Sequence, residues 1–303
     1  MFSSATSLSL FVLFLSFTST LGSSLTPVSK KSVKRSLAKR NPGPWYFEYY
    51  KPMSGASEAT LLEPKYILEN MIYNSGMTVG KQTTQLLEWK ADMVHWRNDL
   101  DIANQPATEN VPKSYAFVGM VSDMNQPITA YRSIPVEYYW QRTNSQPTKA
   151  NVCLDFVISL TNNKNPDHEL MLWLEKEGGQ KPIGYGGKTV RVENLYGRSW
   201  TLYEGPNKSN NNVMVRTLVP DEDFSGSFIG DAREWLMKLV ELKRFPASAY
   251  VSVANMGMEA FWGKSHFEAR SKMNFLWSGN NFQAGYTPPG FKKPTPGSSV
   301  PGF

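Results

Sequence analysis

The fold is decided by the stretch Asp167-His168-Glu169-Leu170-Met171-Leu172-Trp173-Leu174-Glu175. Its leucines fall on even positions, and its carboxylates, methionine and tryptophan fall on odd ones. Successive side chains of a β-strand point to opposite faces, so a period of two predicts a strand with one apolar face. The other face, with Glu169, Met171 and Trp173, fits either the floor of a sugar-binding cleft or an edge strand with chance acids.

Strands recur along most of the chain. Residues 41–65 fit an irregular segment or an edge hairpin, 81–96 fit a strand or a helix, and 98–112 fit a polar loop. Strands in series, without alternating helices, favour an all-β fold, a β-sandwich of the jelly-roll type. Runs of β-branched and aromatic residues between Gly, Asn and Pro turns predict strands at 66–73, 111–118, 133–140, 151–160, 168–176, 188–193, 198–204, 212–219, 249–256 and 266–277.

One segment has the period of a helix. Apolar residues from Phe228 to Val240 recur at steps of three and four, with Asp231 and Glu234 early and Lys238 late. Acids near the start and bases near the end of a helix match its dipole. The pattern predicts one amphipathic helix that packs on the outside of a sheet through its aromatic stripe.

The first 40 residues are expected to be absent from the mature protein. Leu8 to Phe17 is an apolar run of signal-peptide length followed by small residues, which favours a signal peptide over residues 1–23. Basic pairs ending with Lys39-Arg40 then predict a pro-segment over residues 24–40, removed by a dibasic protease; the alternative is a basic arm for an acidic partner. No run is long enough to span a bilayer comfortably.

We therefore expect a secreted, extracellular protein that keeps no membrane contact after processing. A single β-sandwich domain is predicted at residues 41–286. The Pro/Gly-rich residues 287–303 are predicted to be a disordered tail.

Charge argues against nucleic acid as a partner. The chain has 32 lysine and arginine residues and 26 acidic ones, a net charge of +6. Six of the basic residues and none of the acidic ones lie in residues 1–40, so the mature chain carries 26 of each. Binding to phosphate backbones depends on a positive surface, and removal of the leader takes that surface away.

Cysteine and histidine usage gives no support for a disulfide or a metal. Cys153 is the single cysteine and lies in an apolar strand, so we expect a buried, inert thiol. The three histidines, His95, His168 and His266, lack the spacing of zinc ligands. No cofactor motif is present. Asn207-Lys208-Ser209 is a glycosylation sequon in a turn-rich segment.

A second acid lies among large apolar residues near the end of the chain. Gly257 and Gly263 flank Glu259, which is followed by two aromatic residues. Apolar surroundings disfavour the ionised carboxylate and raise its pKa, which suits a general acid. Asp155, on the polar face of an apolar strand, needs a buried partner, and a second carboxyl group is one candidate.

With these motifs in order, the chain resembles glycoside hydrolase family 12, the endoglucanases and xyloglucanases. The resemblance covers roughly residues 65–278, and its strength lies in the order of several short motifs. The matching motifs are Lys113-Ser114-Tyr115-Ala116, Ser133-Ile134-Pro135, Asn151-Val152-Cys153-Leu154-Asp155, Glu169-Leu170-Met171-Leu172-Trp173-Leu174, Pro182-Ile183-Gly184, Ser199-Trp200-Thr201-Leu202-Tyr203-Glu204-Gly205 and Gly257-Met258-Glu259-Ala260-Phe261-Trp262-Gly263.

The resemblance implies a two-sheet, concanavalin-like jelly roll with a long cleft and retaining hydrolysis of β-1,4-glucans. It implies that Glu169 is the nucleophile, that Glu259 is the acid/base, and that Asp155 hydrogen-bonds Glu169. Retaining enzymes of this kind hold their two carboxyl groups about 5–5.5 Å apart. The substrate-binding residues implied are Trp173 and Met171 beside the nucleophile, together with Tyr73 and Trp96. Core packing is the alternative for each tryptophan and is the expectation for Trp140, Trp200, Trp235 and Trp277.

Three departures from the family pattern bear on function. Met258 and Ala260 stand where the family has Thr and Pro, and a missing Pro would loosen the turn that holds Glu259. Tyr73 stands where a Trp is usual. The main hypothesis is a monomeric endo-β-1,4-glucanase that needs no metal or cofactor. The alternatives are a catalytically weak glucan-binding or decoy protein on the same scaffold and, least favoured, a plain lectin.

Overall fold

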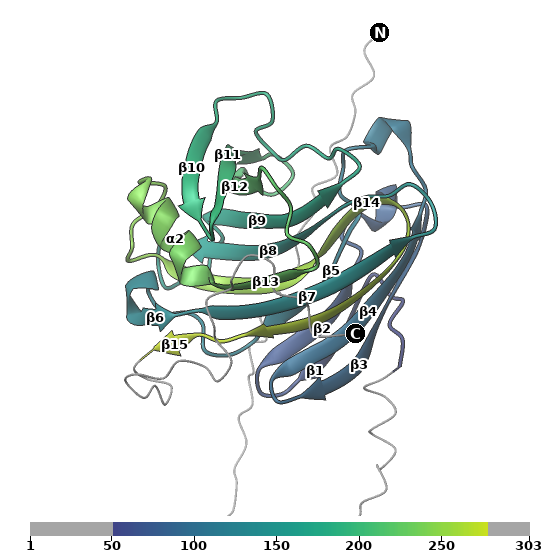
Figure 1. Cartoon of the computed structure of the whole chain (residues 1–303), viewed down its shortest axis with the longest axis horizontal. Coiled ribbons are helices and arrows are strands. Elements are labelled where there is room, and N and C mark those ends of the chain that lie inside the picture. Colours follow the sequence, from purple (N-terminus) through teal and green to yellow (C-terminus); the bar gives the residue numbers. More distant parts are fainter. Residues whose placement is uncertain (1–50, 278–303) are drawn as a thin grey trace, which may run out of the picture.

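The computed structural model describes residues 51–277. The predicted signal peptide (1–23), pro-segment (24–40) and C-terminal tail (287–303) lie outside these residues, as do the outermost parts of the predicted domain. The described residues form two β-sheets and one α-helix (Figure 1), so the all-β jelly-roll prediction is confirmed.

The large sheet contains the strands on which the predicted site residues lie. Its spatial order is β1-β2-β5-β14-β8-β9-β12-β11-β10. Neighbouring strands are antiparallel except β9 and β12, which are parallel. The strands are β1 (Ser57–Leu62), β2 (Tyr66–Met71), β5 (Ser114–Met120), β8 (Lys149–Ser159), β9 (His168–Glu177), β10 (Val190–Leu195), β11 (Arg198–Asn207), β12 (Val213–Pro220) and β14 (Tyr250–Met273).

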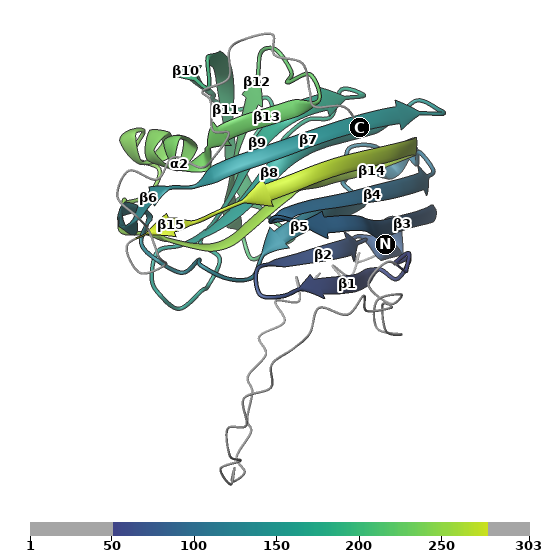
Figure 2. The ribbon, with the colours of Figure 1, turned by 60° about the horizontal axis from the view of Figure 1, so that its bottom comes forward.

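The small sheet packs against one face of the large sheet. It consists of β3 (Gly80–Lys90), β4 (Met93–Ile102), the second half of β14, β7 (Pro135–Asn144) and β13 (Ser227–Asp231), in that order. Figure 2 shows β7, β14, β4 and β3 side by side. A two-stranded ribbon, β6 (Tyr131–Ser133) with β15 (Leu276–Trp277), completes the sheets. Short 3-10 turns occur at η1 (Ser75–Met77), η2 (Pro106–Thr108) and η3 (Ile128–Ala130).

Strand β14 belongs to both sheets. It pairs with β5 and β8 as far as Trp262, and with β4 and β7 from Gly263 onward. Gly263 has φ +132°, and a Cβ there would lie 2.5–2.7 Å from atoms of Thr148, so the crossing requires glycine. The prediction of two separate strands, 249–256 and 266–277, is therefore wrong: one strand runs through, and only Leu276–Trp277 forms a further short strand.

The main hydrophobic core fills the space between the two sheets. Leu170, Leu172 and Leu174 of β9 are fully buried in it, as the alternation predicts. Each buried leucine contributes about 1.5–3 kcal/mol to folding. Trp140, Trp200 and Trp235 lie in this core and Trp277 packs against it, as expected. We call the other face of the large sheet, turned away from the small sheet, the open face.

The helix starts later than its periodicity indicates. Phe228 and Ile229 belong to strand β13, and α2 spans Ala232–Glu241. Asp231 caps α2 by accepting a hydrogen bond from the backbone N–H of Arg233, and it also accepts one from the N–H of Ile134 at 2.7 Å. The cap sets the start because a helix cannot continue into a residue with extended backbone geometry.

Other local predictions are refined by the structure. Residues 57–71 form the edge hairpin, and residues 81–96 divide between the two strands β3 and β4. The predicted polar loop at 98–112 is wrong for its first residues, because β4 continues to Ile102. Among residues 51–277 no helix has the length and apolarity needed to cross a membrane.

Candidate active site

Three carboxyl groups from three neighbouring strands meet on the open face of the large sheet. Glu259 lies on β14, Asp155 on β8 and Glu169 on β9, in the spatial order of those strands. Glu169 raises the pKa of Glu259, and both glutamates raise the pKa of Asp155. Glu169 and Glu259 are 90 positions apart in the sequence. The fold therefore brings together all three residues that the resemblance assigns to catalysis.

Glu259 has the surroundings of a general acid. Its side chain is almost fully buried, and burial is the main cause that raises its pKa to about 7. Asn151 donates a hydrogen bond from Nδ2 to Oε2 at 2.6 Å, and the Tyr73 hydroxyl donates to Oε1 at 3.3 Å. These two donors favour the ionised form and partly offset burial. Glu259 can therefore carry a proton near neutral pH and release it within the site.

An amide partly offsets the effect of burial on Glu169. Burial raises the pKa of Glu169, while a hydrogen bond from the Asn207 side chain lowers it. The amide oxygen of Asn207 accepts hydrogen bonds from the backbone N–H and the hydroxyl of Ser209, at 3.2 and 2.7 Å. Because an amide donates only through its nitrogen, these bonds leave the NH₂ group free for Glu169. The sequon residue Asn207 is thus part of the carboxyl site.

Asp155 lies between the two glutamates. Burial, followed by the charges of Glu169 and Glu259, raises the pKa of Asp155 well above its ordinary value. Its Oδ1 atom is buried and has no hydrogen-bond partner within residues 51–277. The structure thus brings Asp155 into electrostatic contact with Glu169, and the hydrogen bond implied by the resemblance remains a prediction.

A small apolar cluster surrounds the carboxyl groups. Met171 and Trp173 follow Glu169 on the same face of β9, at 7% and 2% exposure. Tyr115 and Phe117 of β5 stack at 5.3 Å between ring centroids, and Cys153 completes the cluster. Burial raises the pKa of the Cys153 thiol well above its ordinary value, in line with an inert side chain. The side chains of Met171 and Trp173 therefore form the floor of the site.

Trp96 does not belong to this site. Its side chain is fully buried in the main core between the sheets, where its ring packs 5.4 Å from that of Phe267. Its Nε1 donates a hydrogen bond to Ser271 at 2.9 Å. The implied role of Trp96 in substrate binding is therefore wrong, because β4 turns the residue towards the core.

Tyr73 reaches the site through its hydroxyl group. Burial, followed by the charges of Glu259 and Glu169, raises the pKa of Tyr73 well above its ordinary value, so the hydroxyl remains a donor. Its ring packs against the apolar cluster. The resemblance implied only that this ring stacks on substrate, and the contact with Glu259 was missed.

Two amides were missed by sequence reasoning. Asn151 shares a face of β8 with Cys153 and Asp155. The same alternation that placed Asp155 on the polar face of this strand could therefore have placed Asn151 beside it. The strand register places it opposite Glu259. For Asn207 the sequence offered only a sequon, because its contact with Glu169 depends on the pairing of β11, β12 and β9.

The two residues beside Glu259 that differ from the family pattern, Met258 and Ala260, face away from the site. The side chains of Met258 and Ala260 point into the main core at 1% and 0% exposure. Strand β14 is paired on both sides here, with β5 and β8. Within residues 51–277 no group of three or more His, Cys, Asp or Glu side chains is arranged to hold a metal ion.

Two glutamic acids on the open face of a two-sheet jelly roll, Glu259 buried and Glu169 half-buried, are the arrangement expected of a glycoside hydrolase. The family model of glycosyl hydrolase family 12 matches residues 64–284. The chain therefore belongs to this family and is a glycoside hydrolase.

Individual relatives agree with this placement. An inactive glycoside hydrolase, XLP1, of Phytophthora nicotianae is 29% identical over 202 residues, 66% of this chain and 82% of the relative. A xyloglucan-specific endo-β-1,4-glucanase of Phytophthora sojae is 28% identical over 200 residues, 65% of this chain and 80% of the relative. The structure of Trichoderma harzianum endoglucanase 3 shares the fold, with a TM-score of 0.66 and 23% identity over 75% of this chain and 98% of its own.

Proposed function

We propose that the protein is a secreted, retaining endo-β-1,4-glucanase that cleaves xyloglucan, cellulose or mixed-linkage glucan. The observation that carries the proposal is the site that Glu169 and Glu259 share, with the pKa of the buried Glu259 raised to about 7. Xyloglucan is the first candidate substrate, because the Phytophthora sojae relative is a xyloglucan-specific enzyme.

The proposed reaction has two steps. In the first, the Glu169 carboxylate attacks the anomeric carbon while Glu259 gives its proton to the glycosidic oxygen, so that the bond to the leaving chain breaks and a glycosyl ester forms. In the second, Glu259 accepts a proton from water as the water attacks the same carbon, and Glu169 leaves as a carboxylate. Both residues return to their starting forms.

Two neighbours are proposed as positioning residues. Asn207 stabilises the ionised form of Glu169 before the attack and after its release. Asp155, whose pKa is raised well above its ordinary value by burial and by the two glutamates, is proposed to share a proton with Glu169. Met171 and Trp173 are proposed to support the sugar rings from beneath, because side chains at 7% and 2% exposure leave little surface for direct stacking.

Secretion is proposed from the apolar run Leu8 to Phe17, and release of the pro-segment from Lys39-Arg40. The mature protein is proposed to act as a monomer. The substrate is the only partner required, because two carboxyl groups suffice for this chemistry.

The proposal is tested by reducing-end release from xyloglucan, carboxymethyl-cellulose and mixed-linkage glucan. The wild type is expected to hydrolyse at least one of them, and Glu169→Gln is expected to lose roughly 10⁴-fold or more in kcat/KM. Glu268→Gln is the matched control, since Glu268 lies on β14 but in the small sheet. Equal loss in both variants, or no hydrolysis by the wild type, would contradict the proposal.

The second candidate is a catalytically weak glucan-binding or decoy protein. The observation in its favour is the inactive relative XLP1. Glucan binding without hydrolysis would support it. The core positions of Met258 and Ala260, together with the two hydrogen bonds that hold Glu259, argue for the enzyme.

A further inference from the structure

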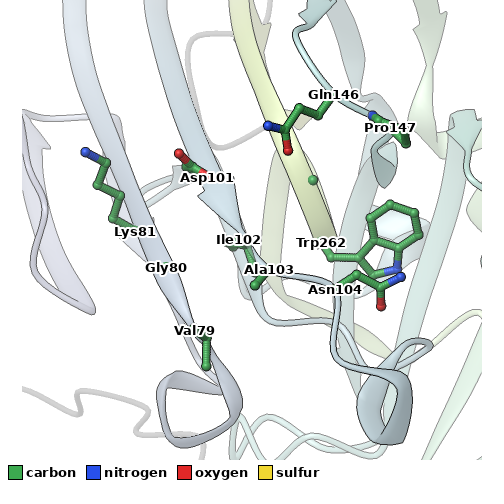
Figure 3. Close-up of a pocket in the computed structure, with 11 residues that line it drawn as sticks. Val79, Gly80, Lys81, Asp101, Ile102, Ala103, Asn104, Gln146, Pro147 and Trp262 are labelled. Atoms are coloured by element: carbon green, nitrogen blue, oxygen red, sulfur yellow. The ribbon is translucent and has the colours of Figure 1, made fainter.

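A pocket of about 740 Å³ lies where β14 crosses from the large to the small sheet. It is formed by the start of β3, the end of β4, the turn between β7 and β8, and residues Trp262 and Gly263 of β14 (Figure 3). Its volume is within the range of roughly 300–1,000 Å³ that ligand sites occupy.

The pocket combines an aromatic ring with planar polar groups. Trp262, half-buried, forms one wall, and Figure 3 shows its indole beside the side chain of Asn104. The exposed amide of Gln146 lies at the opposite end of the ring, and Val79 and Pro147 add apolar surface. An indole that covers the apolar face of a sugar ring, with amides to bond its hydroxyl groups, is a chemistry suited to carbohydrate.

The one carboxylate among the described residues that line this pocket is paired. The carboxylate of Asp101 is paired with the ammonium of Lys264 at 2.8 Å. Lys81 lies opposite Asp101 in the register of β3 and β4, so it faces a negative charge that is already balanced. A hydroxyl-rich, uncharged ligand therefore meets no unpaired carboxylate among these residues, and the Lys81 ammonium is a further donor for its hydroxyl groups.

The pocket is distinct from the carboxyl site. None of its lining residues takes part in the contacts of Glu169, Glu259 or Asp155. Trp262 follows Glu259 by three positions, which is about 10 Å along an extended strand. One polysaccharide molecule is long enough to reach both places.

We propose that this pocket is a second carbohydrate-binding site, which holds a β-1,4-glucan chain against Trp262 while another part of the polymer, or another molecule, occupies the cleft. The choice of β-1,4-glucan as the ligand rests on the proposed function. The site itself is defined by Trp262, Asn104 and Gln146, which the hydrolysis does not use.

The test is the binding stoichiometry of cellohexaose and of a xyloglucan oligosaccharide, measured by titration calorimetry on the full chain with Glu169→Gln, so that the ligand stays intact. Two classes of site per chain are expected. Adding Trp262→Ala, or the pair Asn104→Ala and Gln146→Ala, should remove one class or weaken it at least about tenfold. Trp262→Phe, which keeps an aromatic ring, should retain both.

Tyr139→Ala is the matched control, because Tyr139 is a half-buried aromatic residue of β7 away from this pocket. It should leave two classes of site. A single class in the Glu169→Gln parent, or two classes that survive both sets of pocket variants, would overturn the inference. Hydrolysis by the wild type is scored separately, so the proposed function and the second site can fail independently.

Discussion

The two halves of strand β14 each carry a glutamic acid, in opposite circumstances. Glu259, in the large sheet, is almost fully buried and has only neutral hydrogen-bond donors, Asn151 and Tyr73. Glu268, in the small sheet, is more exposed and contacts the imidazoles of His95 at 2.5 Å and His266 at 3.7 Å. One strand therefore presents the same residue type to an apolar site and to a charged outer surface.

The difference shows what makes a carboxyl group chemically useful. Burial without a counter-charge raises the pKa of Glu259 to about 7, so that its proton is available near neutral pH. The outer carboxylates are instead neutralised by nearby cations, as in the pair of Lys272 with Glu137 at 3.2 Å. Both side chains of this pair are half-buried and still reach solvent, so the pair adds little stability. The first half of β14 should therefore control activity and the second half should not.

The largest effect is expected from Glu259→Gln. The loss of the general acid should lower kcat/KM on xyloglucan roughly 10²- to 10⁴-fold. An aryl β-cellobioside with a good leaving group needs less help from an acid, so the loss on that substrate should be smaller. Kinetics on both substrates check this, and Glu169→Gln should lose activity on both. An equal loss by Glu259→Gln on the two substrates would contradict the acid role.

The next effect concerns Asn207. Asn207→Ala removes the donor that lowers the pKa of Glu169, so kcat/KM should fall roughly tenfold to a hundredfold and the acidic limb of the pH profile should move to higher pH. Ser209→Ala is the milder control, because the backbone N–H of Ser209 still orients the amide. A glycan on Asn207 would occupy the same nitrogen, so mass spectrometry of the active protein should find this sequon unmodified.

A smaller change is expected from Asn151→Ala. Asn151 lowers the pKa of Glu259, so its removal should raise that pKa above about 7. The protonated acid then survives to higher pH, and the basic limb of kcat/KM against pH should move upward. Asn207→Ala and Asn151→Ala thus shift opposite limbs in the same direction. A shift of the acidic limb alone by Asn151→Ala would contradict the assignment.

The smallest effect is expected on the outer face of the small sheet. Lys272→Ala breaks its pair with Glu137 and should lower the free energy of unfolding by less than about 1 kcal/mol. Its kcat/KM should equal that of the wild type. Chemical denaturation and the xyloglucan assay measure the two quantities. A strong loss of activity in Lys272→Ala would contradict the claim that only the first half of β14 controls activity.

Much of the fold could be predicted from local pattern. The alternation of β9 correctly separated Leu170 and Leu172, which enter the core, from Glu169 and Met171 on the open face. The pattern fails at the end of β9, where a bulge turns Glu175 towards Trp140, whose Nε1 donates to it at 2.6 Å. A bulge adds one residue to one strand, and period-two reasoning cannot see it.

The site could be predicted only in part. Residue chemistry and the resemblance identified the three carboxyl groups, but not the amides that tune them. Trp96 was misplaced because only the resemblance assigned it to the cleft, while residues 81–96 fitted a strand or a helix and no pattern showed which way its ring points. Likewise, residues 257–265 were left outside the two predicted strands, whereas β14 passes through them and uses Gly263 to change sheets.

The central claim is that Glu169 and Glu259 act from opposite sides of one glycosidic bond. The most direct measurement is the anomeric configuration of the first product. Proton NMR records it while the wild type cleaves a cello- or xyloglucan oligosaccharide. Carboxyl groups about 5–5.5 Å apart give a β-configured product that mutarotates afterwards. An α-configured first product, which needs roughly 6.5–9.5 Å between them, would contradict the account.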